Sequence, residues 1–235
     1  MKKYIPNSIT CMNLFSGCIA VTMAFNGLFL LSLLFILLSA VFDFFDGMVA
    51  RLLHVSSVIG KELDSLSDMV SFGMAPSVIL YTRLTQISDS QILPFLAFLI
   101  AVFSGLRLAK FNVDTRQTSS FIGLPTPANA LFFASLISIS DEMTPMPSYL
   151  DGSLFALLNS NAYVILFLIA VFSYLLVSEI PMFSLKFKDL SWEHNKVRFV
   201  FLAISLCLII GLQLAAFPFI ILLFLVMSVV TAYKS

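Results

Sequence analysis

The feature that most constrains this chain is a series of long apolar stretches that follow one another along nearly its whole length. A helix needs about 20 consecutive, mostly apolar residues to cross a bilayer. Eight stretches of roughly that length stand at 9–25, 28–50, 65–82, 92–111, 127–141, 161–180, 197–212 and 215–232. We therefore predict an all-α, polytopic membrane helical bundle of about eight transmembrane helices. The range is six to eight, because the fifth stretch is short and the last two nearly abut.

The composition of the chain agrees with a membrane location. Of its 235 residues, 60% are hydrophobic and only 11% are charged, whereas about a quarter of the residues in a typical soluble domain are charged. So few charged side chains cannot solvate a soluble globule of this size, which excludes a cytosolic enzyme and a disordered scaffold. The net charge is +0, so no global field attracts polyanions and no nucleic acid partner is expected.

The basic residues indicate how the helices are oriented. Lys and Arg are enriched in the cytoplasmic loops of membrane proteins. If the N-terminus is cytoplasmic and the chain crosses eight times, every Lys and Arg except Arg83 falls on the cytoplasmic side. We therefore expect a multi-pass protein, integral to the cell (inner) membrane, with both termini facing the cytoplasm.

Four aspartates lie where charge is costly, at the adjoining ends of the second and third stretches. Asp43 and Asp46 are three residues apart, and Asp64 and Asp68 are four apart, so each pair shares one face of a helix. The connection at 52–60 is short, which makes the two helices antiparallel neighbours. The spacing therefore predicts that the four carboxylates meet at one depth, just inside the cytoplasmic surface.

A divalent cation is the preferred explanation for this acidic cluster. Arg51 and Lys61 are the nearby cations, and two positive charges cannot neutralise four negative ones. Carboxylate oxygens are ligands that suit Mg²⁺ or Mn²⁺, as one ion or two. A purely structural cluster is the first alternative. A cation transporter is a more distant one, because transporter sites lie near the bilayer midplane and this cluster lies at an edge.

The full pattern resembles the signature of the CDP-alcohol phosphatidyltransferases, with every fixed position filled. It reads Asp43-x2-Asp46-Gly47-x2-Ala50-Arg51-x8-Gly60-x3-Asp64-x3-Asp68. The resemblance implies an enzyme that moves a phosphatidyl group from a CDP-lipid to an alcohol and releases CMP. It covers roughly residues 5–190, the expected catalytic core, and leaves a transmembrane hairpin at about 197–232 within a single domain of residues 1–235.

The resemblance also implies roles for individual residues, and a homodimer. The implied metal ligands, for two Mg²⁺ or Mn²⁺ ions, are Asp43, Asp46, Asp64 and Asp68. Asp68 would in addition be the general base that acts on the acceptor hydroxyl, and Arg51 would hold a phosphate. The residues implied to contact the CDP-lipid are Asn7, Thr10, Gly47, Ala50, Arg51, Ser57 and Gly60. Capping of the first helix by Asn7 or Thr10 is an open alternative.

The acceptor is suggested by residues that follow the aspartates. Ser65 and Met69 stand where glycerol-phosphate transferases typically have proline and lysine, and the segments 107–112, 121–127 and 177–181 resemble serine-accepting family members. The implied substrates are CDP-diacylglycerol and L-serine. Candidate serine contacts are Arg107 and Lys110 for the carboxylate and Glu179 for the ammonium. Interfacial or lipid-phosphate roles for these residues, an ether-lipid (archaeol) donor and another small alcohol stay open.

Overall fold

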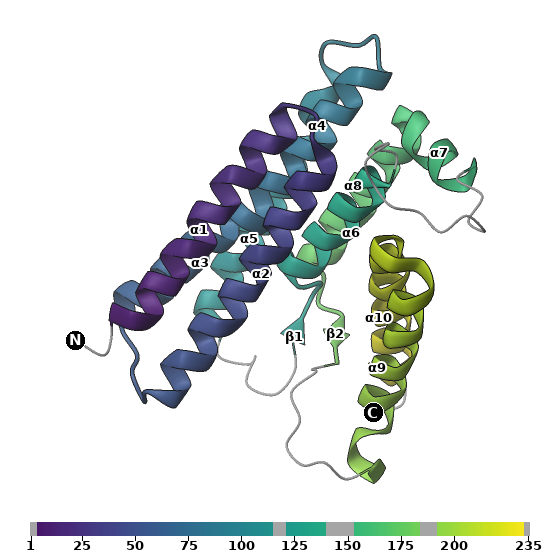
Figure 1. Ribbon diagram of the computed structural model, residues 1–235. Coiled ribbons are helices and arrows are strands. Elements are labelled where there is room, and N and C mark those ends of the chain that lie inside the picture. Colours follow the sequence, from purple (N-terminus) through teal and green to yellow (C-terminus); the bar gives the residue numbers. More distant parts are fainter. Residues whose placement is uncertain (1–3, 115–120, 140–152, 184–191, 233–235) are drawn as a thin grey trace.

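The computed structural model describes residues 4–114, 121–139, 153–183 and 192–232 of the chain (Figure 1). Within these ranges the chain forms ten α-helices, short 3-10 and π segments, and one pair of two-residue strands. Each of the eight predicted stretches contains a helix. The predicted all-α bundle is therefore confirmed.

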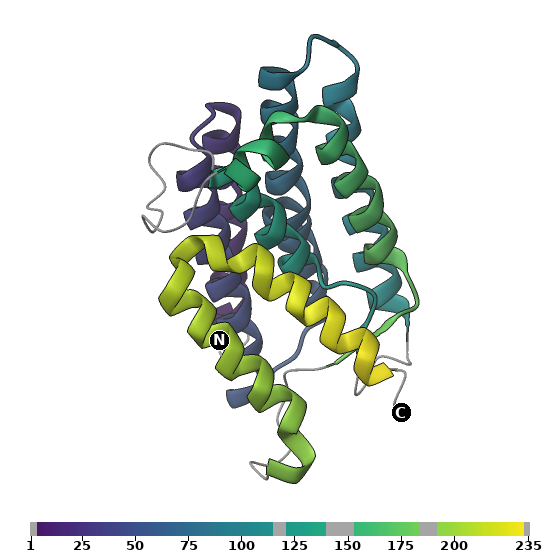
Figure 2. The same ribbon diagram turned by 90° about the vertical axis from the view of Figure 1, so that its right-hand side faces the viewer.

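The first two helices form an antiparallel hairpin along one side of the bundle. Helix α1 spans Tyr4–Phe25 and helix α2 spans Phe29–Leu52, and they run side by side in both views (Figures 1 and 2). Gly27 in the turn has a φ of +73°, a conformation that glycine adopts without steric cost. This tight turn lets α2 fold back along α1, toward the end of the bundle where α3 begins.

The third predicted stretch is longer than expected and contains an irregular turn. Helix α3 (Val58–Asp68) continues through a π-helical segment, η1 (Met69–Met74), into α4 (Ala75–Ile87). Such π turns are rare and occur often at functional sites. This one begins directly after Asp68, so the backbone changes its pitch at the last of the four aspartates.

The middle of the chain supplies the rest of the central bundle. The remaining elements up to the second strand are η2 (Leu93–Phe98), α5 (Leu99–Val113), β1 (Phe121–Ile122), α6 (Thr126–Ser138), α7 (Ser153–Ser160), α8 (Ala162–Val177) and β2 (Pro181–Met182). The strands pair antiparallel, with Phe121 opposite Met182. Helix α7 was not predicted, because its eight residues are too few to stand out as a span.

The C-terminal part forms the predicted helical hairpin. Helix α9 (Trp192–Leu212) is followed by the 3-10 turn η3 (Gln213–Ala215) and by α10 (Ala216–Ala232). The two helices pack against each other, and α10 also contacts α6 and β2 (Figure 2). The hairpin is therefore attached to the bundle mainly through its second helix.

Length and composition support a membrane location for the described residues. Four stretches are long and apolar enough to cross a bilayer: Tyr4–Phe25, Phe29–Leu52, Leu93–Val113 and Asn195–Ala232. The last contains the α9–α10 hairpin except for the first three residues of α9, and α6 and α8 are shorter apolar helices. Helices suit a bilayer because their backbone polar groups are bonded internally. The number of crossings stays a prediction.

One end of the bundle carries the elements that bear the predicted site. The start of α1, the end of α2, the start of α3, the two strands and the end of α10 all lie toward this end (Figure 1). The compartment that it faces stays a prediction. That prediction depends on the distribution of Lys and Arg, and six of these residues lie outside the described ranges: Lys2, Lys3, Arg116, Lys186, Lys188 and Lys234.

Candidate active site

Three of the four predicted carboxylates converge between α2 and α3. Asp43, Asp64 and Asp68 each place a carboxylate oxygen so that the three atoms lie within 4.8 Å of one another. All three side chains are half-buried. Asp64 Oδ1 is buried and has no hydrogen-bond partner in the described part of the chain. A buried oxygen without a partner, next to two further carboxylates, fits a site for a hard cation.

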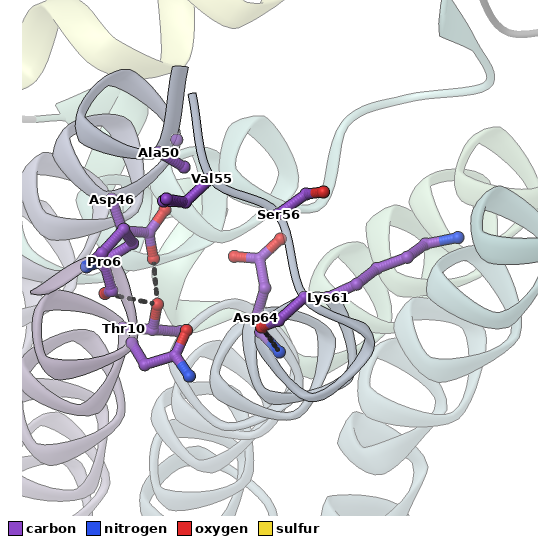
Figure 3. Close-up of a pocket in the computed structure, with 12 residues that line it drawn as sticks. Pro6, Thr10, Asp46, Ala50, Val55, Ser56, Lys61 and Asp64 are labelled. Atoms are coloured by element: carbon purple, nitrogen blue, oxygen red, sulfur yellow. Dashed lines mark hydrogen bonds between the residues drawn. The ribbon is translucent and has the colours of Figure 1, made fainter. Parts of the chain in front are cut away.

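The fourth aspartate is held differently. Asp46 is only 6% exposed, and its Oδ2 accepts a hydrogen bond of 2.6 Å from the Thr10 hydroxyl of α1. Asp46 and Asp64 face each other across the same cavity (Figure 3). Asp46 is not among the three grouped carboxylates, and its role as a metal ligand stays a prediction.

A cavity of about 250 Å³ opens between α1, α2 and α3 beside these carboxylates (Figure 3). We call it the α1–α3 cavity. It is lined by Pro6, Asn7, Thr10, Asp46, Gly47, Ala50, Val55, Ser56, Ser57, Gly60, Lys61 and Asp64. Every residue that the sequence implied for CDP-lipid binding lines this cavity except Arg51.

The two glycines of the motif line the cavity for different reasons. A Cβ on Gly60 would lie 2.9 Å from Asn7 Oδ1 and 2.9 Å from Ser57 Oγ, so a side chain here would displace these two polar groups from their positions. A Cβ on Gly47 would meet nothing closer than Arg51 at 3.7 Å. Packing among the described residues therefore tolerates a larger side chain at 47, and the glycine serves to leave the cavity open.

Two predicted lipid contacts have structural partners of their own. The Thr10 hydroxyl lies 3.0 Å from the Pro6 carbonyl oxygen as well as bonding Asp46, so it is committed to the protein and does not cap α1. Ser57 is the N-cap of α3, where its Oγ accepts a hydrogen bond of 3.0 Å from the Gly60 N–H. Contacts of Thr10 and Ser57 with a lipid stay predictions.

The two nearby cations do not lie among the carboxylates. Arg51 is exposed and lines a neighbouring open hollow with Ala50 and His54. Lys61 Nζ donates a hydrogen bond of 2.8 Å to the backbone carbonyl of Asn112, and its side chain extends away from Asp64 (Figure 3). The ammonium of Lys61 is therefore used to join α3 to α5.

A second cavity, of about 280 Å³, gathers the predicted acceptor residues. We call it the α5–α8 cavity; it is lined by Arg107, Lys110, Phe111, Val113, Asp114, Ile122, Leu176, Val177, Ser178 and Glu179. Arg107 is only 7% exposed, and its Nε has no hydrogen-bond partner in the described ranges. The Arg107 charge also acts on Asp68. Arg107 on the wall of this cavity therefore lies within electrostatic range of the carboxylate cluster.

The wall of the α5–α8 cavity is shaped by the turn before α6. Gly123 has a φ of +76°, and a Cβ there would lie 2.7 Å from the Leu176 carbonyl oxygen. Its N–H donates to Ile180 O at 3.0 Å, and the Leu124 N–H donates to Leu175 O at 2.9 Å. This glycine therefore fixes the segment after α8, which carries Glu179, against the start of α6.

Sequence reasoning missed Asn13 as a site residue. It is fully buried on α1, and its Nδ2 lies 3.4 Å from Asp68 Oδ1. Its place three residues after Thr10, on the same helical face, was the signal that was available. Ser67 provides a further buried contact, through a hydrogen bond of 3.2 Å from its Oγ to the Thr10 carbonyl.

These features define a helical membrane protein with a carboxylate cluster and two cavities near one end. The chain belongs to the CDP-alcohol phosphatidyltransferase family, whose sequence profile matches residues 3–175. The resemblance that the aspartate motif indicated is therefore confirmed. Members of this family depend on divalent cations, and the carboxylates of Asp43, Asp64 and Asp68 provide a place to hold one.

Individual relatives are similar over much of the chain. The CDP-diacylglycerol–serine O-phosphatidyltransferase of Helicobacter pylori strain 26695 is 30% identical over 210 residues, which is 88% of this chain and 83% of the relative. The enzyme of that name from Bacillus subtilis is 39% identical over 53% of this chain and 70% of its own length. The archaetidylserine synthase of Methanothermobacter thermautotrophicus is 34% identical over 56% of this chain and 56% of its own length.

Proposed function

We propose that this protein transfers the phosphatidyl group of CDP-diacylglycerol to the hydroxyl of L-serine, giving phosphatidylserine and CMP. The observation that carries the proposal is the α5–α8 cavity, which gathers Arg107, Lys110 and Glu179 next to the carboxylate cluster. Serine carries one carboxylate and one ammonium, and this cavity offers groups of both signs. The names of the relatives from H. pylori and B. subtilis support the same acceptor.

We propose that the four aspartates hold two divalent cations, Mg²⁺ or Mn²⁺. Their oxygens are hard ligands of the kind that both ions prefer. When bound, the ions supply positive charge that neutralises the pyrophosphate of the donor as CMP leaves. The metal-ligand set is Asp43, Asp46, Asp64 and Asp68.

In this proposal the donor nucleotide occupies the α1–α3 cavity. Gly47 and Ala50 offer small side chains there, and Asn7 and Gly60 line the opposite wall. Arg51 reaches the donor phosphate from the adjoining hollow, because a guanidinium can bond two oxygens at once. The lipid tails then extend from this end of the bundle into the bilayer.

Asp68 acts as the general base on serine. The serine hydroxyl oxygen forms a bond to the phosphorus of the phosphatidyl group, the bond from that phosphorus to CMP breaks, and the hydroxyl proton passes to the Asp68 carboxylate. A carboxylate is a weak base, so its contribution depends on being close to the hydroxyl. Arg107 and Lys110 bind the serine carboxylate, and Glu179 binds the ammonium, which orients the hydroxyl toward Asp68.

A CDP-linked ether lipid is an alternative donor to CDP-diacylglycerol. One relative is named an archaetidylserine synthase, and nothing in the described motif distinguishes acyl from ether tails. Another small alcohol as acceptor is a further alternative. A cation transporter is disfavoured by membership in a transferase family.

The test is an assay in detergent micelles with the purified full-length protein. CDP-diacylglycerol and Mn²⁺ or Mg²⁺ are mixed with serine, glycerol 3-phosphate or inositol in separate reactions, and CMP release and the lipid product are followed. Of the three alcohols, we expect only serine to give a lipid product, phosphatidylserine. We expect no product after EDTA removes the metal ions. A product with another alcohol would overturn the acceptor assignment, and a parallel reaction with CDP-archaeol identifies the donor.

We also propose that the protein is a homodimer in the inner membrane, with the site and both termini facing the cytoplasm. The bias of Lys and Arg along the chain supports this orientation. Reporter fusions at each terminus measure the orientation. Cross-linking in native membranes measures the oligomeric state.

A further inference from the structure

Asn13 on α1 is completely buried at the centre of the packing between α1, α2 and η1. Its side-chain Nδ2 donates a hydrogen bond of 3.4 Å to Asp68 Oδ1. Its backbone carbonyl accepts a hydrogen bond of 3.2 Å from the Ser39 hydroxyl of α2. Asn13 is thus attached both to the aspartate and to the helix that carries the other half of the carboxylate cluster.

Ser71 holds the oxygen end of the Asn13 amide, opposite the end that faces Asp68. The Ser71 hydroxyl in η1 donates to Asn13 Oδ1 at 2.8 Å, and it also lies 3.2 Å from the Asn13 backbone carbonyl. A serine hydroxyl can donate or accept, so Ser71 could face either end of the amide, whereas an ionised carboxylate only accepts and needs the NH₂ group. The oxygen of the amide is therefore turned to Ser71, and the NH₂ group is left to face Asp68.

The close approach of α1 and η1 makes this arrangement rigid. One turn after Asn13, a Cβ on Gly17 would overlap the Ser71 side chain, so the two segments are in backbone contact here. Ser71 lies within the π-helical turn that begins after Asp68. The position of the Ser71 hydroxyl relative to Asp68 is therefore set by that turn, and Asn13 links both groups.

We propose that Asn13 is a positioning residue, which Ser71 orients so that its amide holds the Asp68 carboxylate in the direction needed to accept the serine proton. This inference rests on the proposed function of Asp68 as the base. A neutral amide N–H only donates, so it occupies one oxygen of Asp68 and leaves the other for the acceptor. A base held in one direction is more effective than one that samples several directions.

The test compares three variants in the micelle assay, with kcat and KM measured separately for serine and CDP-diacylglycerol. Asn13→Ala removes the amide, and Ser71→Ala removes its orienting partner. Ser16→Ala is the matched control, because Ser16 is also buried on α1 but its hydroxyl donates to the Phe35 carbonyl at 2.8 Å and touches no aspartate. Thermal unfolding of each variant in the same detergent monitors the fold.

We expect Asn13→Ala to lower kcat by about 10- to 100-fold, as losses of groups that orient a site residue commonly do, while KM for CDP-diacylglycerol stays unchanged. Ser71→Ala should lower kcat less. A double variant that combines Asn13→Ala with Ser71→Ala should have the same kcat as Asn13→Ala alone, because Ser71 acts through Asn13. Ser16→Ala should keep the wild-type kcat. A purely structural role would instead lower the unfolding temperature and act additively.

The outcomes separate this inference from the proposed function. A wild-type protein that forms no phosphatidylserine overturns the proposed function. A fully active wild type whose kcat is unchanged in Asn13→Ala and Ser71→Ala overturns the role of Asn13 alone. If Asn13→Ala does not fold, Ser71→Ala decides: a lower kcat with unchanged KM supports the inference, and a wild-type kcat contradicts it.

Discussion

The two cavities differ in how their charged groups are held. In the α1–α3 cavity Asp46 accepts a hydrogen bond from Thr10, and the neighbouring Asp68 accepts one from Asn13. In the α5–α8 cavity the buried Arg107 has an Nε without a hydrogen-bond partner in the described ranges. The carboxylates of Asp46 and Asp68 thus have hydrogen-bond donors from the protein, whereas Arg107 Nε, like Asp64 Oδ1, has no hydrogen-bond partner among the described residues.

The difference has a physical meaning for a two-substrate enzyme. A buried polar atom without a partner is costly, at about 1–3 kcal/mol for a neutral group and more for a charged one. Internal hydrogen bonds offset that cost for Asp46 and Asp68 and orient these two carboxylates before any ligand binds. On the other side, a ligand carboxylate would provide the partner that Arg107 lacks. We infer that the donor side is pre-organised, whereas binding of the acceptor completes the second cavity.

Replacing Asp68, the proposed general base, should have the largest effect on kcat. Asp68→Asn keeps the size of the side chain but cannot accept the serine proton, so we expect kcat to fall by about 10²- to 10⁴-fold, the usual contribution of a general base. CMP release in micelles measures it. Asp89→Asn is the control, because Asp89 is exposed and lies in the connection that follows α4, far along the chain from the aspartate motif. Near wild-type activity of Asp68→Asn would contradict its role as base.

Arg107→Gln tests whether the Arg107 guanidinium, whose Nε lacks a hydrogen-bond partner among the described residues, binds the carboxylate of the acceptor. Loss of a charge-assisted hydrogen bond of about 1.5–3 kcal/mol corresponds to a rise in KM for serine of roughly 10- to 150-fold. KM for CDP-diacylglycerol should not change. Arg83→Gln serves as the control, because Arg83 donates to the Asn159 carbonyl at 3.0 Å in a different part of the bundle. A rise in KM for the donor instead would place Arg107 on the lipid side.

Gly123→Ala probes the wall of the α5–α8 cavity. An alanine at a positive φ costs about 1–2 kcal/mol, and its Cβ would also press on the Leu176 carbonyl. Gly27→Ala is matched to it, since Gly27 has a φ of +73° but its Cβ would meet nothing closer than 3.5 Å. Thermal unfolding should show a larger loss for Gly123→Ala, and only this variant should raise KM for serine. If the two variants lose equal stability and leave KM for serine equally unchanged, the cavity wall does not depend on Gly123.

The smallest effect is expected at Ser57. As an N-cap, Ser57→Ala should lose about 1 kcal/mol of stability, whereas Ser57→Gly should lose only a few tenths. An unchanged KM for CDP-diacylglycerol in both variants would limit Ser57 to this capping role. If Ser57 binds the donor phosphate, both variants will show an equal rise in KM, and the α1–α3 cavity will then be shaped by its ligand as well as by its own hydrogen bonds.

Much of the α1–α3 site could be predicted because it depends on short-range geometry. The spacing of Asp43 and Asp46, and of Asp64 and Asp68, places each pair on one helical face, and a short connection brings the two faces together. The apolar stretches likewise predicted the helices without any tertiary information. The family motif then assigned roles to the same residues.

Other features were decided only by the tertiary structure. The α5–α8 cavity joins residues 107–114 to residues 176–179, and no local pattern specifies such a long-range contact. The hydrogen bonds from Thr10 and Asn13 depend on the packing of α1 against α2 and α3, and on the π turn after Asp68. The helices could be predicted from the length of the apolar stretches, and the convergence of the aspartates from helical periodicity, because both are local properties of the chain. Packing decided which polar side chains hold those aspartates, because that depends on how closely neighbouring backbones approach.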